Sequence, residues 1–108
     1  MQPASISREV KQGIARLYLE NKGELEALNP VGLESFASKV LAIIQGERDE
    51  AGSSHDLEVL EGSMKHLKRD AITFRNNEPG TDDYDFAKSD CRSLLDSTKM
   101  WLRLEGLI

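Results

Sequence analysis

One helix-forming segment carries two side chains that could share a proton or a metal ion. His66 and Asp70 are four positions apart, and residues at that spacing are neighbours on the surface of a helix. Imidazole and carboxylate groups are common ligands of Zn²⁺ and related ions, but a protein site usually supplies at least three of them. Two ligands do not make a site, so the sequence predicts no metal centre and no cofactor.

A catalytic role for the same pair would need a nucleophile. Cys91 is the only cysteine, and a nucleophilic enzyme holds its serine or cysteine beside a base that a third group orients. Cys91 falls on the apolar face of the last predicted helix, where it is expected to pack as a small hydrophobic residue. The sequence contains no nucleophile elbow, phosphate-binding glycine loop or CxxC pair. We therefore expect no catalytic residues, and an enzyme built on His66, Asp70 and Cys91 is a minor alternative.

The segment TDDYDFAKSD, residues 81–90, contains four carboxylates. An EF-hand loop needs oxygen ligands at alternate positions, a glycine at the sixth and a glutamate at the twelfth, and no register here has that pattern. The arrangement is typical of a helix start, with Thr81 as the cap and the carboxylates near the positive end of the helix dipole. A Mg²⁺ or Ca²⁺ site on Asp82, Asp83 and Asp85 is the weaker alternative.

The sequence KHLKR and a nearby arginine form a positive patch on an acidic chain. Its basic side chains lie away from the apolar stripe of the same predicted helix: Lys65, Lys68, Arg69 and Arg75. The net charge is −5 and the pI is near 5.0, so the protein as a whole repels phosphate backbones. Nucleic-acid binding through this patch is therefore kept as the alternative function, and charges on a solvated helix face are the simpler interpretation.

Apolar residues at spacings of three and four predict four helices, over residues 5–22, 30–45, 56–76 and 81–105. The segment 46–55 is polar, contains glycines and serines and lacks periodicity, so we expect an exposed loop. No segment combines strict alternation with β-branched residues, so no strand is predicted.

The 108 residues are expected to form a single helical domain. The last two predicted helices are each on the order of 30 Å long, and a short connection between them favours antiparallel packing. The helix at 30–45 is apolar around much of its circumference and should lie at the centre. The predicted fold is all-α, a small four-helix bundle with a long C-terminal αα-hairpin.

The C-terminal sequence MWLRLEGLI places apolar residues on more than one side of the helix end. One interpretation is that the tail folds back over the bundle and Trp101 closes its open end. The other is a partner or oligomer interface in which Trp101, Leu102 and Leu104 are the apolar anchors. Lys68, Arg69 and Arg75 would then set orientation and association rate.

These observations lead to one functional expectation. A single cysteine fits a reducing compartment, and the longest apolar run, VLAII at residues 40–44, is too short to cross a bilayer. We expect a cytoplasmic helical protein–protein interaction module, such as an adaptor, an inhibitor or an assembly subunit. Its partner would be another protein or a second copy of the chain.

Overall fold

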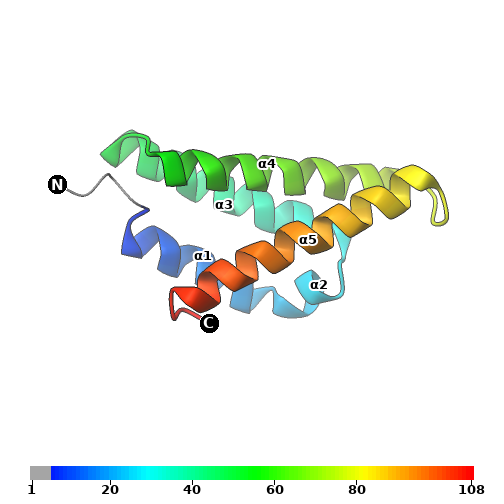
Figure 1. Ribbon diagram of the computed structural model, residues 1–108, viewed down its shortest axis with the longest axis horizontal. Coiled ribbons are helices and arrows are strands. Elements are labelled where there is room, and N and C mark those ends of the chain that lie inside the picture. The colour runs from blue at the N-terminus through cyan, green and yellow to red at the C-terminus, as the bar shows by residue number, and fades with distance from the viewer. Residues whose placement is uncertain (1–5) are drawn as a thin grey trace.

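The computed structural model describes residues 6–108 as an all-helical chain, which confirms the all-α part of the predicted fold. Within these residues there is no strand. Residues 6–108 form five helices rather than four, with the bounds α1 Arg8–Glu20, α2 Lys22–Glu26, α3 Pro30–Ala51, α4 His55–Asn76 and α5 Asp82–Leu104, which are labelled in Figure 1. The additional helix is the short α2, which follows α1 almost directly.

Polar side chains begin four of these helices by capping free backbone N–H groups. Ser7, Asn29, Ser54 and Thr81 accept hydrogen bonds from backbone N–H groups in the first turns of α1, α3, α4 and α5. Pro30 occupies the first position of α3, where a helix leaves the N–H unpaired in any case. The capping role predicted for Thr81 is confirmed.

The exposed loop predicted at 46–55 is wrong, because α3 continues to Ala51 and only residues 52–54 connect it to α4. The polar residues of this segment occupy the solvent side of a helix. Gly52 then ends α3 with a φ of 83°, a left-handed value that glycine adopts at low cost, and its N–H donates to the carbonyl of Arg48.

Side-chain contacts hold this last part of α3. The Gln45 amide donates to Asp49 at 2.9 Å, one helical turn further on. Arg48 Nη1 lies 2.8 Å from Glu61 Oε2 of α4, and this ion pair raises the pKa of Arg48 and lowers that of Glu61. These polar contacts, rather than a stripe of apolar residues, stabilise the last part of α3.

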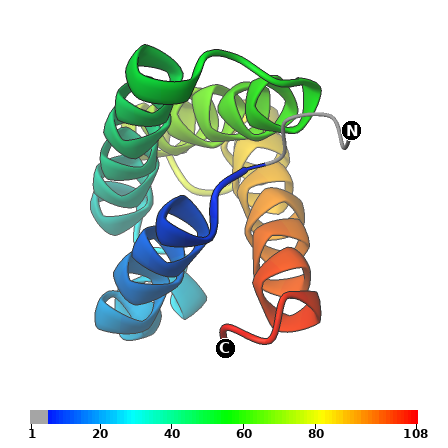
Figure 2. The same ribbon diagram turned by 90° about the vertical axis from the view of Figure 1, so that its left-hand side faces the viewer.

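The helices pack around α3 and α4, which share the most extensive contact. The other face of α4 packs against α5, and α1 and α2 pack against α3. Figure 2 shows α3 and α5 on opposite sides of the molecule, with α4 across the top between them and α1 at the lower left beside α3. The prediction that the segment beginning at Pro30 lies at the centre is consistent with these contacts.

Every helix contributes side chains to one apolar core. The largest fully buried residues are Ile14, Tyr18, Leu25, Leu33, Phe36, Val40, Ile44, Leu57, Met64, Leu67, Cys91 and Leu102. The Tyr18 and Phe36 rings meet edge to face, with centroids 6.5 Å apart. None of the helices described here is long and apolar enough to cross a membrane.

Candidate functional site

A groove lies between the first half of α4 and the last half of α5. The two helices are close where residues 77–81 connect them and diverge toward the other end (Figure 1). The groove has a volume of about 550 Å³, and its apolar lining comes from Ile6, Val59, Leu60 and Trp101. Its apolar residues thus come from three separate parts of the chain.

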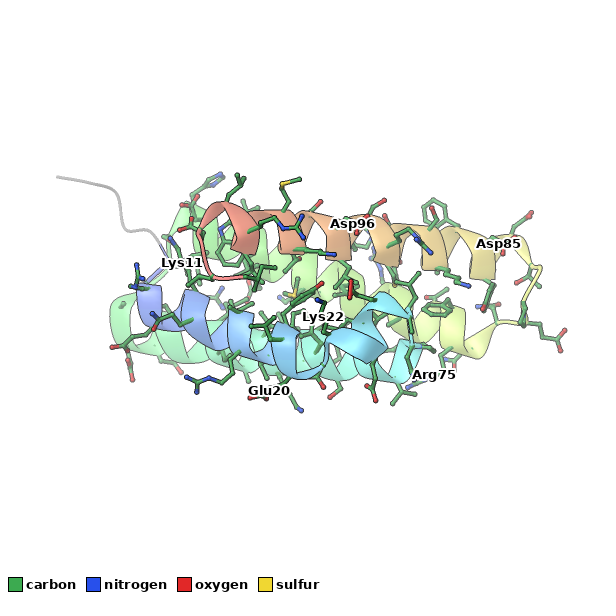
Figure 3. All side chains as sticks on the ribbon, turned by 90° about the horizontal axis from the view of Figure 1, so that it is seen from below. Lys11, Glu20, Lys22, Arg75, Asp85 and Asp96 are labelled. Carbon is green, nitrogen blue, oxygen red and sulfur yellow. The ribbon has the colours of Figure 1, made fainter. Side chains whose placement is uncertain are left out.

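Polar groups also line the groove. Ser63 of α4 and Ser97 of α5 line the groove, as do Lys11 and Glu105. Lys11 Nζ lies 3.1 Å from Glu105 Oε2, and Figure 3 shows Lys11 where α1 approaches the C-terminal end of α5. A mixture of apolar and polar lining residues is the usual composition of a protein-binding site.

The three predicted C-terminal anchors have different environments. Trp101 is half-buried and lines the groove. Leu104 is 80% exposed, and Met100, one turn earlier, is 55% exposed. Leu102 is 0% exposed, so its prediction as a partner-binding residue is wrong. Leu102 faces the core because it lies about 100° around the helix from Trp101.

The chain end folds back on α5, as one of the two interpretations of the tail expected. The Leu107 N–H donates to the Leu102 carbonyl at 3.0 Å, and Gly106 has a φ of 74°. Leu107 and Ile108 pack against the core as half-buried residues. The surplus apolar surface near this end therefore consists mainly of Met100 and Leu104.

The predicted basic residues do not join the groove. Arg75 Nη1 lies 2.7 Å from Glu34 Oε2 of α3, and Figure 3 shows Arg75 at the end of the molecule away from Lys11. The helical rise places Arg75 about 18 Å along α4 from Ser63, the last groove residue of that helix. Lys68 is half-buried and Arg69 is exposed. Neither lines the groove, although both were predicted to orient the same partner.

A second cluster lies between the middle of α4 and the first half of α5. His66 Nε2 is 2.7 Å from Asp90 Oδ2 and 3.3 Å from Asp70 Oδ2. One ligand atom from each of the three residues lies within 4.8 Å of the others. Asp70 is buried, whereas the His66 and Asp90 side chains are 42% and 27% exposed. The cluster therefore has a buried side and a side that faces solvent.

Burial and mutual repulsion change the acidity of this region. The pKa of Asp70 is raised to about 6, first by burial, then by a hydrogen bond shared with the Asp90 carboxyl group and by the Asp90 charge, while the charges of His66 and Arg69 act in the opposite direction. The pKa of Cys91 is raised to about 12 by burial and by the same two carboxylates. The Cys91 thiol contacts the Leu67 carbonyl at 4.0 Å and packs in the core, as predicted.

The sequence predicts the pairing of His66 with Asp70 but not the approach of Asp90. The missing signal was the register of the two last helices. A connection centred near residue 79 places residues opposite each other when their numbers sum to about 158, as for Leu67 and Cys91. This register would have placed Asp90 beside His66.

The three aspartates considered as an alternative metal site lie at the start of α5. Asp82, Asp83 and Asp85 are exposed in its first turn, after the Thr81 cap. Within residues 6–108, His66, Asp70 and Asp90 are the group whose ligand atoms converge.

Comparison of the chain with protein-family models, with curated proteins and with solved structures found no match. Function is therefore inferred from the groove and the polar cluster alone.

Proposed function

We propose that this chain is a small cytosolic interaction protein without catalytic activity of its own, and that it binds another protein through the groove between α4 and α5. The observation that carries the proposal is the half-buried Trp101 beside the exposed Val59 in a groove of about 550 Å³. Tryptophan is enriched among the residues that dominate binding energy. An indole held at the wall of an open groove offers a partner a large rigid contact.

The proposed occupant is an amphipathic helix of the partner protein. The groove runs between two diverging helices, so a third helix can lie in it with its apolar side toward Val59, Leu60 and Trp101. Met100 and Leu104 extend the apolar surface of α5 beside the groove. The ion pair between Lys11 and Glu105 also lines the groove, where such pairs contribute to specificity more than to affinity.

The proposal includes an architecture. In this proposed architecture the chain is a four-helix bundle that ends in a long αα-hairpin. The consecutive helices α1 and α2 together occupy one position of the bundle, and α3, α4 and α5 occupy the other three. The diverging ends of that hairpin leave the groove open. A bundle of this kind can bind a further helix without rearranging its core.

The nucleic-acid alternative has less support. Glu34 accepts a hydrogen bond from Arg75 Nη1 at 2.7 Å, and Glu61 lies 3.9 Å from Lys65. Two of the four basic residues of the patch are thus close to carboxylates, on a chain of net charge −5.

The experiment compares two valine-to-glutamate variants. Val59 in the groove is 56% exposed and Val31 on α3 is 60% exposed, so each substitution adds one charge at a similarly exposed site. The tagged chain and both variants are used to capture proteins from a lysate treated with nuclease. We expect a stoichiometric partner that Val59→Glu loses and Val31→Glu keeps.

Size-exclusion chromatography with light scattering separates self-association from binding to a different protein. A dimer that Val59→Glu dissociates would identify the partner as a second copy of the chain. Equal capture by both variants, or the absence of both a dimer and a stoichiometric partner, would contradict the proposed groove. Partners that disappear after nuclease treatment would instead favour the basic patch.

A further inference from the structure

The contacts of His66 with its two carboxylates are close but are not hydrogen bonds. Nε2 lies 2.7 Å from Asp90 Oδ2 and 3.3 Å from Asp70 Oδ2, yet both oxygens are buried and accept no hydrogen bond within the described residues. An N–H group donates along the axis of its ring nitrogen. The two oxygens are therefore near Nε2 but away from the direction in which its proton would point.

Such an arrangement is compatible with a shared metal ion. In a metal site the nitrogen lone pair points at the ion, and the other ligands lie to the side of that axis. At metal–ligand distances of about 2.0–2.2 Å, neighbouring ligand atoms are roughly 2.8–3.6 Å apart. The two separations from Nε2, 2.7 and 3.3 Å, are close to this range.

We propose that His66, Asp70 and Asp90 bind one divalent first-row transition-metal ion, of which Zn²⁺ is the probe of choice, between α4 and α5. Imidazole nitrogen suits Zn²⁺ and its neighbours in the series, whereas Ca²⁺ and Mg²⁺ prefer oxygen ligands alone. Three protein ligands leave at least one coordination position free. The exposed side of His66 and Asp90 provides water for that position and a path for the ion.

The burial of Asp70 also favours a cation at this point. The Asp70 side chain is 9% exposed, and its Oδ2 has no hydrogen-bond partner in the described part of the chain. Burying a carboxylate beside a second carboxylate is costly even with the His66 imidazole 3.3 Å away, and a cation between the two aspartates would offset that cost. Cys91 is adjacent but its thiol contacts the Leu67 carbonyl, so the proposal assigns it no bond to the ion.

A proton shared by the two carboxylates is the competing explanation. It would also relieve the repulsion that raises the pKa of Asp70. A shared proton does not, however, predict that the cluster prefers one kind of metal ion or binds one ion per chain. The two explanations therefore differ in what happens when Zn²⁺ is added at neutral pH.

The proposal does not depend on the groove. A bound ion would connect α4 and α5 through side chains of both helices, and a ligand that binds only the folded chain raises the free energy of unfolding in proportion to the logarithm of its concentration. Metal binding can therefore be measured without knowing any partner.

The test uses the full chain without a histidine tag, freed of metal by a chelator that is then removed. Zn²⁺ is titrated by calorimetry, and Co²⁺ is titrated by visible absorption, which reports coordination by protein ligands. The variants are His66→Gln, Asp90→Asn and Asp70→Asn. The control is His55→Gln, which removes the other histidine, an exposed residue at the start of α4. Circular dichroism verifies that each variant is folded.

We expect one equivalent of Zn²⁺, a visible Co²⁺ spectrum and a higher midpoint of thermal unfolding with Zn²⁺. Each cluster variant should lose affinity by at least about tenfold, the effect that even supporting groups of metal sites commonly have, and His55→Gln should bind like the unmodified chain. Absence of binding, or binding that His66→Gln and Asp90→Asn retain, would overturn the proposal. Equal loss in His55→Gln would do so too, because it would indicate binding by surface histidines.

Discussion

The ring of Phe74 meets the ring of Tyr84 edge to face, with centroids 5.4 Å apart. This contact lies beside the connection between α4 and α5, and it joins the two helices where they are closest. Further along, the same register places Cys91 against the Leu67 carbonyl and Asp90 against His66. The divergence beyond that point leaves room for the groove at Val59 and Trp101, so one pairing of helices underlies both candidate sites.

Asp70→Asn should change how stability depends on pH. The folded-state pKa of Asp70, about 6, is above its ordinary value of 3.8, so the folded chain holds this proton more tightly than the unfolded chain. The contribution of Asp70 to stability is therefore fully present below about pH 4 and is lost as pH rises to about 6. Asp70→Asn should lack this decrease in the free energy of unfolding. At pH 7 it should be more stable than the unmodified chain by up to about 3 kcal/mol.

Urea unfolding from pH 4 to pH 8, with a chelator present to exclude metal ions, measures this difference. The charged and titratable groups around Asp70 are His66, Arg69, Asp90 and Cys91, and all of them remain in the variant. A variant that is less stable than the unmodified chain at pH 7 would show that the Asp70 carboxylate has a partner that compensates for its burial.

Leu102→Ala and Leu104→Ala should have very different effects, although the residues are two positions apart. Leu102 is 0% exposed and Leu104 is 80% exposed. Removing a buried leucine side chain costs about 2–5 kcal/mol, whereas substitutions at exposed positions usually stay within about 0.5 kcal/mol. Denaturant unfolding of both variants checks this, and similar losses would mean that the end of α5 is rotated relative to the structure described here.

The sequence predicted the helices whose apolar residues share one face. The apolar residues of α4 and α5 recur at spacings of three and four because each helix buries one side, and both helices were predicted close to their observed bounds. The last two turns of α3 were missed because contacts such as the ion pair from Arg48 to Glu61, rather than an apolar stripe, hold them. Periodicity is a weak signal in such a segment.

The candidate sites were less predictable than the fold. Trp101 and Leu104 were selected as apolar residues at a chain end, but the face of each residue depends on the rotation of α5, which also buries Leu102. Asp90 is distant from His66 in the sequence and joins it only through the helix register. The groove depends on the divergence of α4 and α5, which no local pattern of residues encodes.

Cys91 should resist alkylation while the chain is folded. It is 0% exposed, and its pKa is raised to about 12 by burial and by Asp70 and Asp90. Relative to a thiol with the ordinary pKa of 9.0, this corresponds to about a thousandfold less thiolate, the reactive form, at pH 8. Mass spectrometry after iodoacetamide treatment should find modification in denaturant and almost none in its absence. Rapid modification of the folded chain would indicate that α4 and α5 separate readily.

Trp101→Ala should weaken partner binding more than it weakens the fold. Trp101 lines the groove and is half-buried rather than enclosed, so its removal takes away apolar surface that a partner helix would contact. Circular dichroism should show nearly unchanged helix content, while the partner captured by the unmodified chain should be reduced as in Val59→Glu. Val31→Ala, which shortens an exposed apolar side chain of α3 outside the groove, serves as the control for loss of apolar surface.

Whether a bound partner covers Trp101 can also be tested by fluorescence, because Trp101 is the only tryptophan in the chain. If a partner helix covers the indole, its fluorescence emission should shift to shorter wavelength on binding, because the ring leaves water for an apolar environment. Val31→Glu should preserve the shift and Val59→Glu should abolish it. Loss of helix content in Trp101→Ala, together with unshifted emission when the partner binds, would instead assign Trp101 to the closure of the helical core.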